Sequence, residues 1–222
     1  MADESSEPRP DESGPDASGS ETPGSIATGS GGRGQEKTGP GTVVLVVGPS
    51  GAGKDALLQG VARWLSGDRR FQFPKRLVSR SAHPAEDHDV LQRGEAAVRE
   101  HPEAFALSWQ AHGLTYALPS EIDEIVKSGG CVAFNASRTV VDDARGRFRN
   151  VKVVYIDASR EVRAERLAAR GREDKSEINA RLARDVTSFS RSGADVVILN
   201  EQSLEEGVAS LHAALTGLVQ HE

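Results

Sequence analysis

The sequence of 222 residues predicts a three-layer α/β domain built on a parallel β-sheet. Three observations lead to this prediction. Short continuous apolar runs, typical of strands that are covered on both faces, recur along the chain. Segments with helical periodicity separate these runs, and the first run ends in a glycine-rich turn that leads directly into a helical pattern.

The first 41 residues differ in composition from the rest of the chain. They consist mainly of Ser, Gly, Pro, Asp and Glu, and no aromatic residue precedes Trp64. Such a segment cannot bury enough apolar surface to offset the entropy lost on ordering, so we expect a disordered acidic leader over residues 1–41 and a folded domain over 42–222. The leader lacks the apolar run of a secretory signal and is too acidic for a transit peptide, which favours a cytoplasmic protein.

Charge and cysteine content exclude several classes of function. Eight acidic and three basic residues lie in the leader, so the folded part carries little of the net charge of -6 and offers no general basic field for nucleic acid. Cys131 is the only cysteine, which excludes an intrachain disulfide, and its place in the run CVAF predicts a buried structural thiol. No apolar stretch approaches the ~20 residues that a membrane-spanning helix needs.

The predicted elements follow in a regular order. A strand from Thr42 (TVVLVVG) precedes the glycine-rich turn, and the helix after the turn places four apolar side chains on one face. These are Leu57, Leu58, Val61 and Leu65. Further strands are predicted at 131–135, 151–157 and 195–200. Polar residues dominate from about 71 to 119, between the first predicted helix and the strand at 131–135. We interpret this stretch as a small insert that binds the acceptor substrate.

Two helix starts carry the pattern of a capping box, Ser120 with Asp123 and Ser203 with Glu206. The helix that begins after Ser203 is predicted to bury one apolar stripe. This stripe consists of Leu204, Val208, Leu211, Leu215 and Val219.

The glycine-rich turn reads GPSGAGKD. Its glycines let successive backbone N–H groups point at one oxyanion, and the following helix adds the positive end of its dipole. The lysine then reaches the β- and γ-phosphates of a nucleotide. A glycine-rich turn with an incidental lysine is the alternative, but a preceding strand and a following helix are the context that a phosphate-binding P-loop requires. We therefore expect ATP to bind to Gly48, Pro49, Ser50, Gly51, Ala52, Gly53, Lys54 and Asp55.

Asp55 occupies the position at which such loops usually carry the Ser or Thr that binds Mg²⁺. A second ligand is usually an Asp at the end of a later strand, yet the candidate strand here ends in Asn135 and Ser137. We interpret the two changes as an exchange, in which Asp55 provides the hard oxygen for Mg²⁺ and the later strand provides neutral groups. The alternative is that Asp55 only favours the positive end of the helix dipole.

A segment rich in arginine follows the third predicted strand. Arg166 and Arg170 lie one helical turn apart, and Arg181 follows on the next predicted helix. A helix–loop–helix with this charge suits a lid over about 166–181, which closes on a transferring phosphoryl group and neutralises its oxygens. We assign Arg163 instead to a solvated helix face, paired with glutamates.

Four stretches carry a resemblance to known enzymes: GPSGAGKD, FALSWQAHGLTYALPSEID, NASR and RGREDKSEINARLAR. With them the chain from roughly Thr42 to Val219 resembles the guanylate-kinase-like branch of the nucleoside monophosphate kinases, and more closely the ribose 1,5-bisphosphate phosphokinases. The GKD ending and SEINARLAR are the most specific motifs, because the loop alone would indicate only a P-loop kinase. The resemblance implies a nucleoside monophosphate kinase-like fold with an acceptor insert and an arginine-bearing lid.

Departures from the guanylate kinase pattern bear on the acceptor. The acids with which those enzymes read guanine are replaced by Leu107 and Ser137, and a site without them loses its discrimination for guanine. The resemblance implies that Arg80 and Tyr116 keep part of the grip on the acceptor, with Ser137 nearby, while a further arginine of the family is absent. The three arginines of the predicted lid match those of the family in their mutual spacing.

The resemblance implies Mg²⁺-dependent transfer of the γ-phosphoryl group of ATP to ribose 1,5-bisphosphate, a route to phosphoribosyl pyrophosphate in phosphonate breakdown. The expected catalytic residues are Lys54, Arg166, Arg170 and Arg181. Two alternatives are a nucleoside monophosphate kinase and a protein-binding scaffold, although guanylate-kinase-like scaffolds tend to lose the loop lysine and the lid arginines. The expected partners are ATP and a small phosphorylated sugar, with no nucleic acid and no membrane, and the sequence leaves the oligomeric state open.

Overall fold

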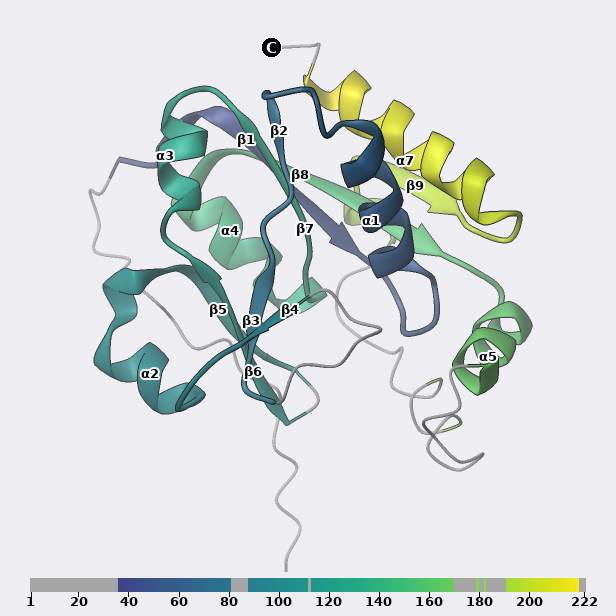
Figure 1. Cartoon of the computed structure of the whole chain (residues 1–222), viewed down its shortest axis with the longest axis horizontal. Coiled ribbons are helices and arrows are strands. Elements are labelled where there is room, and N and C mark those ends of the chain that lie inside the picture. The colour runs from purple at the N-terminus through teal and green to yellow at the C-terminus, as the bar shows by residue number, and fades with distance from the viewer. Residues whose placement is uncertain are drawn as a thin grey trace, which may run out of the picture.

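The computed structural model describes residues 36–80, 88–111, 113–169, 179, 182 and 191–219. Its centre is a five-stranded parallel sheet in the order β2-β7-β1-β8-β9 (Figure 1). The strands are β1 (Thr38–Val47), β2 (Phe71–Gln72), β7 (Cys131–Asn135), β8 (Phe148–Asp157) and β9 (Val196–Leu199). The predicted α/β class with a parallel sheet is confirmed.

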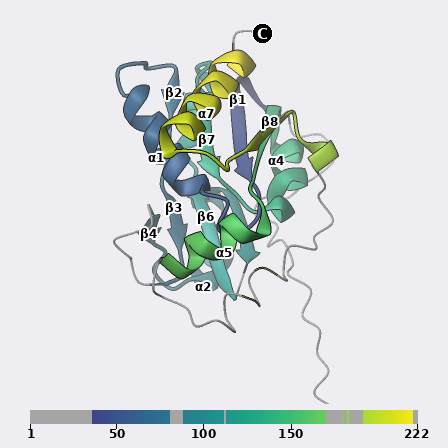
Figure 2. The same cartoon turned by 90° about the vertical axis from the view of Figure 1, so that its right-hand side faces the viewer.

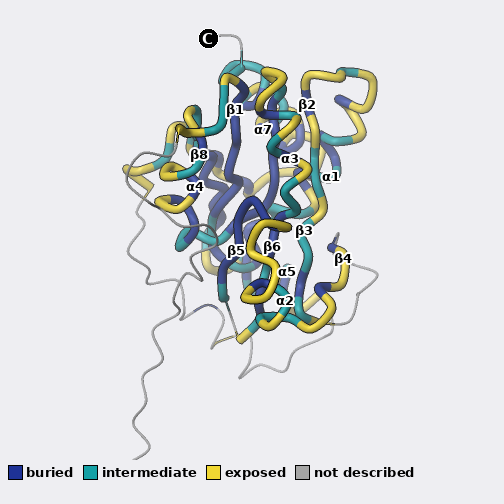
Figure 3. Tube along the Cα trace, turned by 90° about the vertical axis from the view of Figure 1, so that its left-hand side faces the viewer, coloured by how far each residue is buried: buried dark blue, intermediate teal, exposed yellow. Residues whose placement is uncertain are grey.

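Helices cover both faces of this sheet. Helices α1 (Lys54–Trp64) and α7 (Leu204–Val219) lie side by side on one face, and α3 (Ile122–Lys127) and α4 (Val141–Arg147) lie on the other (Figures 1 and 2). Successive residues of β1 alternate between the two cores, with Val44 facing α1 and α7 and Val43 facing α3 and α4. Both are fully buried, and β1 runs as a buried trace through the centre of Figure 3. The continuous apolar run reflects this burial on both faces.

A second, smaller sheet lies beside the lower end of the parallel sheet in Figure 1, in the order β4-β3-β6-β5. It contains β3 (Arg76–Val78), β4 (His88–Val90), β5 (Phe105–Ala111) and β6 (Leu114–Pro119), with α2 (Glu95–Glu100) and a 3-10 turn, η1 (Pro102–Ala104), between β4 and β5. Strands β5 and β6 pair as an antiparallel hairpin. Strand β2 precedes this unit in the chain, but it pairs with β7 at the edge of the parallel sheet.

Helix α1 buries its predicted face, since Leu57, Leu58, Val61 and Leu65 are all buried. It packs closely against α7, because a Cβ on Gly60 would lie 2.3 Å from Cγ2 of Val208. The predicted burial of the Cys131 thiol is also confirmed. No described helix is both long and apolar enough to cross a membrane.

The capping box at the start of α7 is confirmed. The amide of Ser203 donates to Oε2 of Glu206 at 3.1 Å, and the amide of Glu206 donates to Oγ of Ser203 at 3.2 Å. The predicted stripe on α7 is wrong at its first position, because Leu204 is 53% exposed. The packing of α7 on α1 begins about one turn later, where a Cβ on Gly207 would lie 2.8 Å from Leu57.

The predicted capping box at Ser120 is wrong. Helix α3 has Glu121 at its N-cap and no side-chain cap, and Ser120 contributes only its carbonyl oxygen, to the amide of Asp123. The Asp123 carboxylate instead pairs with Arg147 of α4 at 2.6 Å. An ion pair between two packed helices has taken the place of the local cap.

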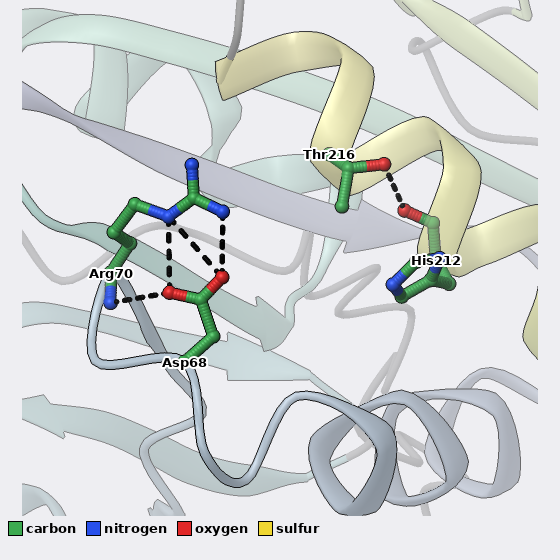
Figure 4. Close-up of polar contacts among 4 residues, drawn as sticks. All are labelled: Asp68, Arg70, His212 and Thr216. Carbon is green, nitrogen blue, oxygen red and sulfur yellow. Dashed lines mark hydrogen bonds and ion pairs between the residues drawn. The ribbon is translucent and has the colours of Figure 1, made fainter.

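Figure 4 shows polar contacts at two other places, the turn between α1 and β2 and helix α7. In the turn between α1 and β2, the Asp68 carboxylate accepts hydrogen bonds from the amide and guanidinium of Arg70, which hold the pKa of Asp68 below its usual range (Figure 4). On α7, Oγ1 of Thr216 donates to the carbonyl oxygen of His212 at 2.9 Å. These contacts stabilise a turn and a helix end rather than forming a site.

Candidate active site

The predicted phosphate loop, residues 48–55, forms the turn between β1 and α1 and includes the first two residues of that helix. Gly51 and Gly53 have φ angles of 84° and 93°, a region that favours glycine. A Cβ on Gly48 would lie 2.0 Å from the carbonyl oxygen of Ile156 in β8, so the backbones pass too closely for any side chain. Nζ of Lys54 donates to the carbonyl oxygens of Gly48 and Pro49, both at 2.8 Å, which holds the ammonium against the loop.

Asn200 supports the loop from the carboxyl end of β9. Its side chain is buried, and Nδ2 donates to the carbonyl oxygen of Ala52 at 2.8 Å. A Cβ on Gly53 would lie 2.5 Å from the same nitrogen, so the amide lies directly against the loop. The sequence analysis missed this residue. Its visible signal was a polar residue at the end of the apolar run DVVILN.

Asp55 connects the loop to both sheets. Its Oδ1 accepts a hydrogen bond from Nδ2 of Asn135 at 2.6 Å and forms an ion pair with Nη2 of Arg76 at 3.2 Å. Asn135 ends β7 and Arg76 begins β3, so one carboxylate oxygen contacts the parallel sheet and the second sheet together. The side chains of Asp55 and Arg76 are only 27% and 12% exposed, which limits the screening of their attraction by water. Arg76 was missed by the sequence analysis.

Tyr116 of β6 lies between an aromatic ring and a cation. On the β5 side it stacks on Trp109, with ring centroids 5.5 Å apart and an angle of 6° between the planes. From the β3 side, the guanidinium of Arg76 lies over the ring at 5.6 Å from its centroid. Because β5 and β3 flank β6 on opposite sides, Trp109 and Arg76 approach the tyrosine from different neighbouring strands.

The other predicted acceptor residues are placed differently. Arg80 lies two residues beyond the end of β3 and is exposed. Ser137 caps a 3-10 turn, η2 (Arg138–Val140), and its Oγ accepts hydrogen bonds from the amide and from Oγ1 of Thr139, at 3.3 and 2.9 Å. Leu107 is buried in the core of the parallel sheet. Arg76 therefore contacts both Tyr116 and Asp55 and links them, whereas Ser137 caps η2.

Arg166 comes from α5 (Arg160–Ala169) and reaches the phosphate loop. One of its terminal nitrogens, Nη1, lies 3.7 Å from the position that a Cβ on Gly53 would occupy. This atom is buried and makes no hydrogen bond among the described residues. A buried guanidinium nitrogen next to a phosphate loop is suited to an anion. The other two predicted lid arginines, Arg170 and Arg181, lie outside the described residues.

The assignment of Arg163 to a solvated face was wrong. The residue is 9% exposed, because this turn of α5 packs against the phosphate loop. A Cβ on Gly51 would lie 2.9 Å from the carbonyl oxygen of Arg163 and 3.0 Å from its Cβ. One turn later on α5, Leu167 packs with Leu182. The helix thus contacts both the phosphate loop and Leu182.

The described residues contain no group of three or more His, Cys, Asp or Glu side chains that could hold a metal ion. In this part of the chain, a cation near the loop would rely on Asp55 together with neutral oxygens and the phosphates of a nucleotide. Mg²⁺ is usually held in this way in kinases, by one or two carboxylates and substrate phosphates. The Asp55 carboxylate is therefore a ligand of the kind that Mg²⁺ takes.

Comparisons with known proteins agree with this geometry. A protein-family model described as Zeta toxin matches residues 32–193. The ribose 1,5-bisphosphate phosphokinase PhnN of Methylobacterium radiotolerans is 48% identical over 180 residues, which cover 79% of this chain and 98% of that protein. The PhnN of Brucella melitensis is 46% identical over 167 residues, 75% of this chain and 86% of that protein.

Among solved structures, the fold is similar to that of guanylate kinase from Anaplasma phagocytophilum. The two share a TM-score of 0.57 at 18% identity, over 82% of this chain and 87% of that one. At this identity the likeness concerns the fold, which is that of a P-loop kinase.

Proposed function

Because this chain belongs to the family of the ribose 1,5-bisphosphate phosphokinases, we propose that it transfers the γ-phosphoryl group of ATP to the 1-phosphate of ribose 1,5-bisphosphate. The product is 5-phosphoribosyl 1-diphosphate. Both relatives match this chain over at least three quarters of its length. The family therefore supports both the donor and the acceptor in this proposal.

On the donor side, the phosphate loop binds the phosphates of ATP through its backbone N–H groups, and Lys54 stabilises charge on the β- and γ-phosphates. Nη1 of Arg166, which has no hydrogen-bond partner among the described residues, lies beside Gly53 and supplies a further positive charge for the γ-phosphate. Arg170 and Arg181 would complete this charge when the lid closes. In phosphoryl transfer most of the catalysis is positioning and charge stabilisation, which these groups provide.

On the acceptor side, the observation that favours a sugar phosphate over a nucleotide is the covered ring of Tyr116. Trp109 stacks on the ring and the guanidinium of Arg76 lies over it, so the ring is already engaged and is a poor platform for stacking a nucleobase. Leu107 is buried in the core and offers no hydrogen-bonding group to a base edge. A phosphorylated sugar needs cations and hydroxyl contacts instead, and Tyr116, Arg76 and Arg80 offer them.

Mg²⁺ would be held by Asp55 and would neutralise charge on the β- and γ-phosphates. The contacts of Asp55 support this role. Asn135 and Arg76 both engage Oδ1, and among the described residues no hydrogen bond reaches Oδ2. Such outer contacts orient a carboxylate for a metal. The contact is consistent with the proposed exchange of residues, because a second carboxylate at position 135 would lie about 2.6 Å from the first.

The test of the function is a turnover assay of the purified protein with Mg²⁺ and ATP. We expect conversion of ribose 1,5-bisphosphate to 5-phosphoribosyl 1-diphosphate, detected by phosphorus NMR, and rates about 100-fold lower with GMP, AMP or UMP, since a nucleobase would leave water without gaining hydrogen bonds in this site. Turnover of GMP at a rate comparable with that of ribose 1,5-bisphosphate would favour the alternative function, that of a nucleoside monophosphate kinase.

The test of the metal role is the dependence of kcat on Mg²⁺ concentration for Asp55→Asn. A neutral amide is a poorer ligand for a hard cation, so the half-saturating Mg²⁺ concentration should rise at least about tenfold. Asp142→Asn is the matched control, because its carboxylate is 95% exposed on α4. If Asp55→Asn and the control give the same Mg²⁺ curve, Asp55 only favours the helix dipole.

A further inference from the structure

The guanidinium of Arg76 lies between the phosphate loop and the second sheet, which carries the proposed acceptor residue Tyr116. Its Nη2 pairs with Asp55, and the same group lies over the ring of Tyr116. The side chain is 12% exposed, so this cation is held in a largely buried position. Neither the sequence motifs nor the proposed roles of Lys54 and Arg166 account for it.

The position of Arg76 is set by a continuous series of contacts. Buried Trp109 stacks on Tyr116, Tyr116 underlies the guanidinium, and the guanidinium pairs with Asp55, which Asn135 holds from β7. Each partner belongs to a different element, so the planar group is oriented before any substrate binds. A guanidinium carries five N–H donors, and the ion pair with Asp55 uses one nitrogen, Nη2. The remaining donors can reach an anion.

The chemistry at this place requires such an anion contact. Asp55 directly follows Lys54, which marks the β- and γ-phosphates, so Arg76 lies close to the point at which the acceptor must approach ATP. Two phosphates that approach one another repel, and a cation between them reduces this repulsion. A planar guanidinium also fixes the orientation of a phosphate through paired hydrogen bonds, which an ammonium cannot do.

We infer that Arg76 binds the attacking phosphate of the acceptor, a phosphorylated sugar, and holds it in line with the γ-phosphate of ATP. This inference rests on the proposed function and assigns the acceptor contact of that reaction. An oxygen of the bound phosphate forms a bond to the γ-phosphorus while the bond to the bridging oxygen of ADP breaks. The acceptor phosphate is already anionic, so Arg76 neither takes nor gives a proton. Arg80, farther along the chain from β3, is left to the second phosphate of the sugar.

The experiment measures KM for ribose 1,5-bisphosphate and for ATP separately in wild type, Arg76→Gln and Arg76→Lys. In Arg76→Gln we expect KM for the sugar bisphosphate to rise about 10- to 100-fold, the usual loss for a hydrogen bond to a charged group, while KM for ATP changes less than about threefold. Arg76→Lys should recover part of the loss, because it keeps the charge without the planar group. Arg99→Gln is the control. Arg99 also pairs with a carboxylate, that of Glu95 in α2, but its side chain is 72% exposed.

Equal increases in both KM values, or an unchanged KM for the sugar bisphosphate, would overturn the inference, because Arg76 would then act only through Asp55. If Arg76→Gln does not fold, the KM values of Arg76→Lys and calorimetric binding of ribose 1,5-bisphosphate to that variant without ATP decide in the same way. Failure of the proposed function has a different result. Wild type itself would then not turn over ribose 1,5-bisphosphate, and the inference would fail with it.

Discussion

The hydrogen bond between Asn135 and Asp55 predicts that Asn135→Asp destabilises the protein, although the two side chains have nearly the same shape. In the wild type, Nδ2 of Asn135 donates to Oδ1 of Asp55 at 2.6 Å. The substitution replaces this donor by a second carboxylate at the same place. Asn135 is 8% exposed and ends a central strand, so the new charge cannot move freely into solvent.

The size of the effect follows from the distance. For two unit charges 2.6 Å apart, an effective dielectric constant of about 20 gives a repulsion of about 6 kcal/mol. Rotation of the new side chain to about 5 Å reduces it to about 3 kcal/mol. The ion pair of Asp55 with Arg76 persists and offsets part of what remains. We expect a loss of about 3 kcal/mol in the free energy of unfolding, or about 6–12 °C in Tm for a domain of this size.

The assay is urea unfolding at pH 7 of wild type, Asn135→Asp, Asp55→Asn and the double variant Asp55→Asn/Asn135→Asp. The double variant restores an amide–carboxylate pair with the two groups exchanged, so it should regain most of the loss, with a coupling energy of about 3 kcal/mol. Asn135→Ala is the control for loss of the hydrogen bond without a new charge. If Asn135→Asp is no less stable than Asn135→Ala, or the coupling energy is near zero, the reasoning from this contact is refuted.

Three further predictions concern the loop and α7. Lys54→Ala should reduce phosphoryl transfer below detection and leave the circular dichroism spectrum unchanged, because the glycine backbone rather than the lysine sets the shape of the loop; an unchanged rate would leave only the protein-binding scaffold. Asn200→Ala should cost about 1–3 kcal/mol in urea unfolding and raise KM for ATP, since the carbonyl of Ala52 loses a buried donor; an unaltered KM for ATP would contradict this role. Hydrogen bonds from Oγ and the amide of Ser203 lower the pKa of Glu206 from its ordinary 4.5, so this carboxylate stabilises α7 above that pH and loses its effect as the pH falls. The difference in Tm between wild type and Glu206→Gln at pH 7 should therefore shrink as the pH falls below 4.5, and a difference that does not vary with pH would contradict the capping role.

Features that depend on neighbours close in sequence could be predicted from the sequence. The continuous apolar run of β1 and the face of α1 with Leu57 and Val61 follow from burial on both faces and from helical periodicity. The two partners of the capping box, Ser203 and Glu206, lie only three positions apart in the sequence. The phosphate loop was visible for the same reason, because its glycines and Lys54 act through backbone shape within one turn.

The sequence by itself therefore determined the layers, the loop and the family resemblance, whereas the tertiary structure decided which side chains meet at the site. Asp55 lies 80 residues from Asn135 and 21 from Arg76, and Asn200 lies 148 from Ala52. These contacts depend on the strand order, which places the ends of β7 and β9 and the start of β3 around one loop. The same reason explains the failed cap at Ser120, since the local pattern favoured a cap while Arg147, on another helix, took the carboxylate of Asp123. Local periodicity carries no information about such partners, because their attraction acts only after the chain has brought distant segments within a few ångströms.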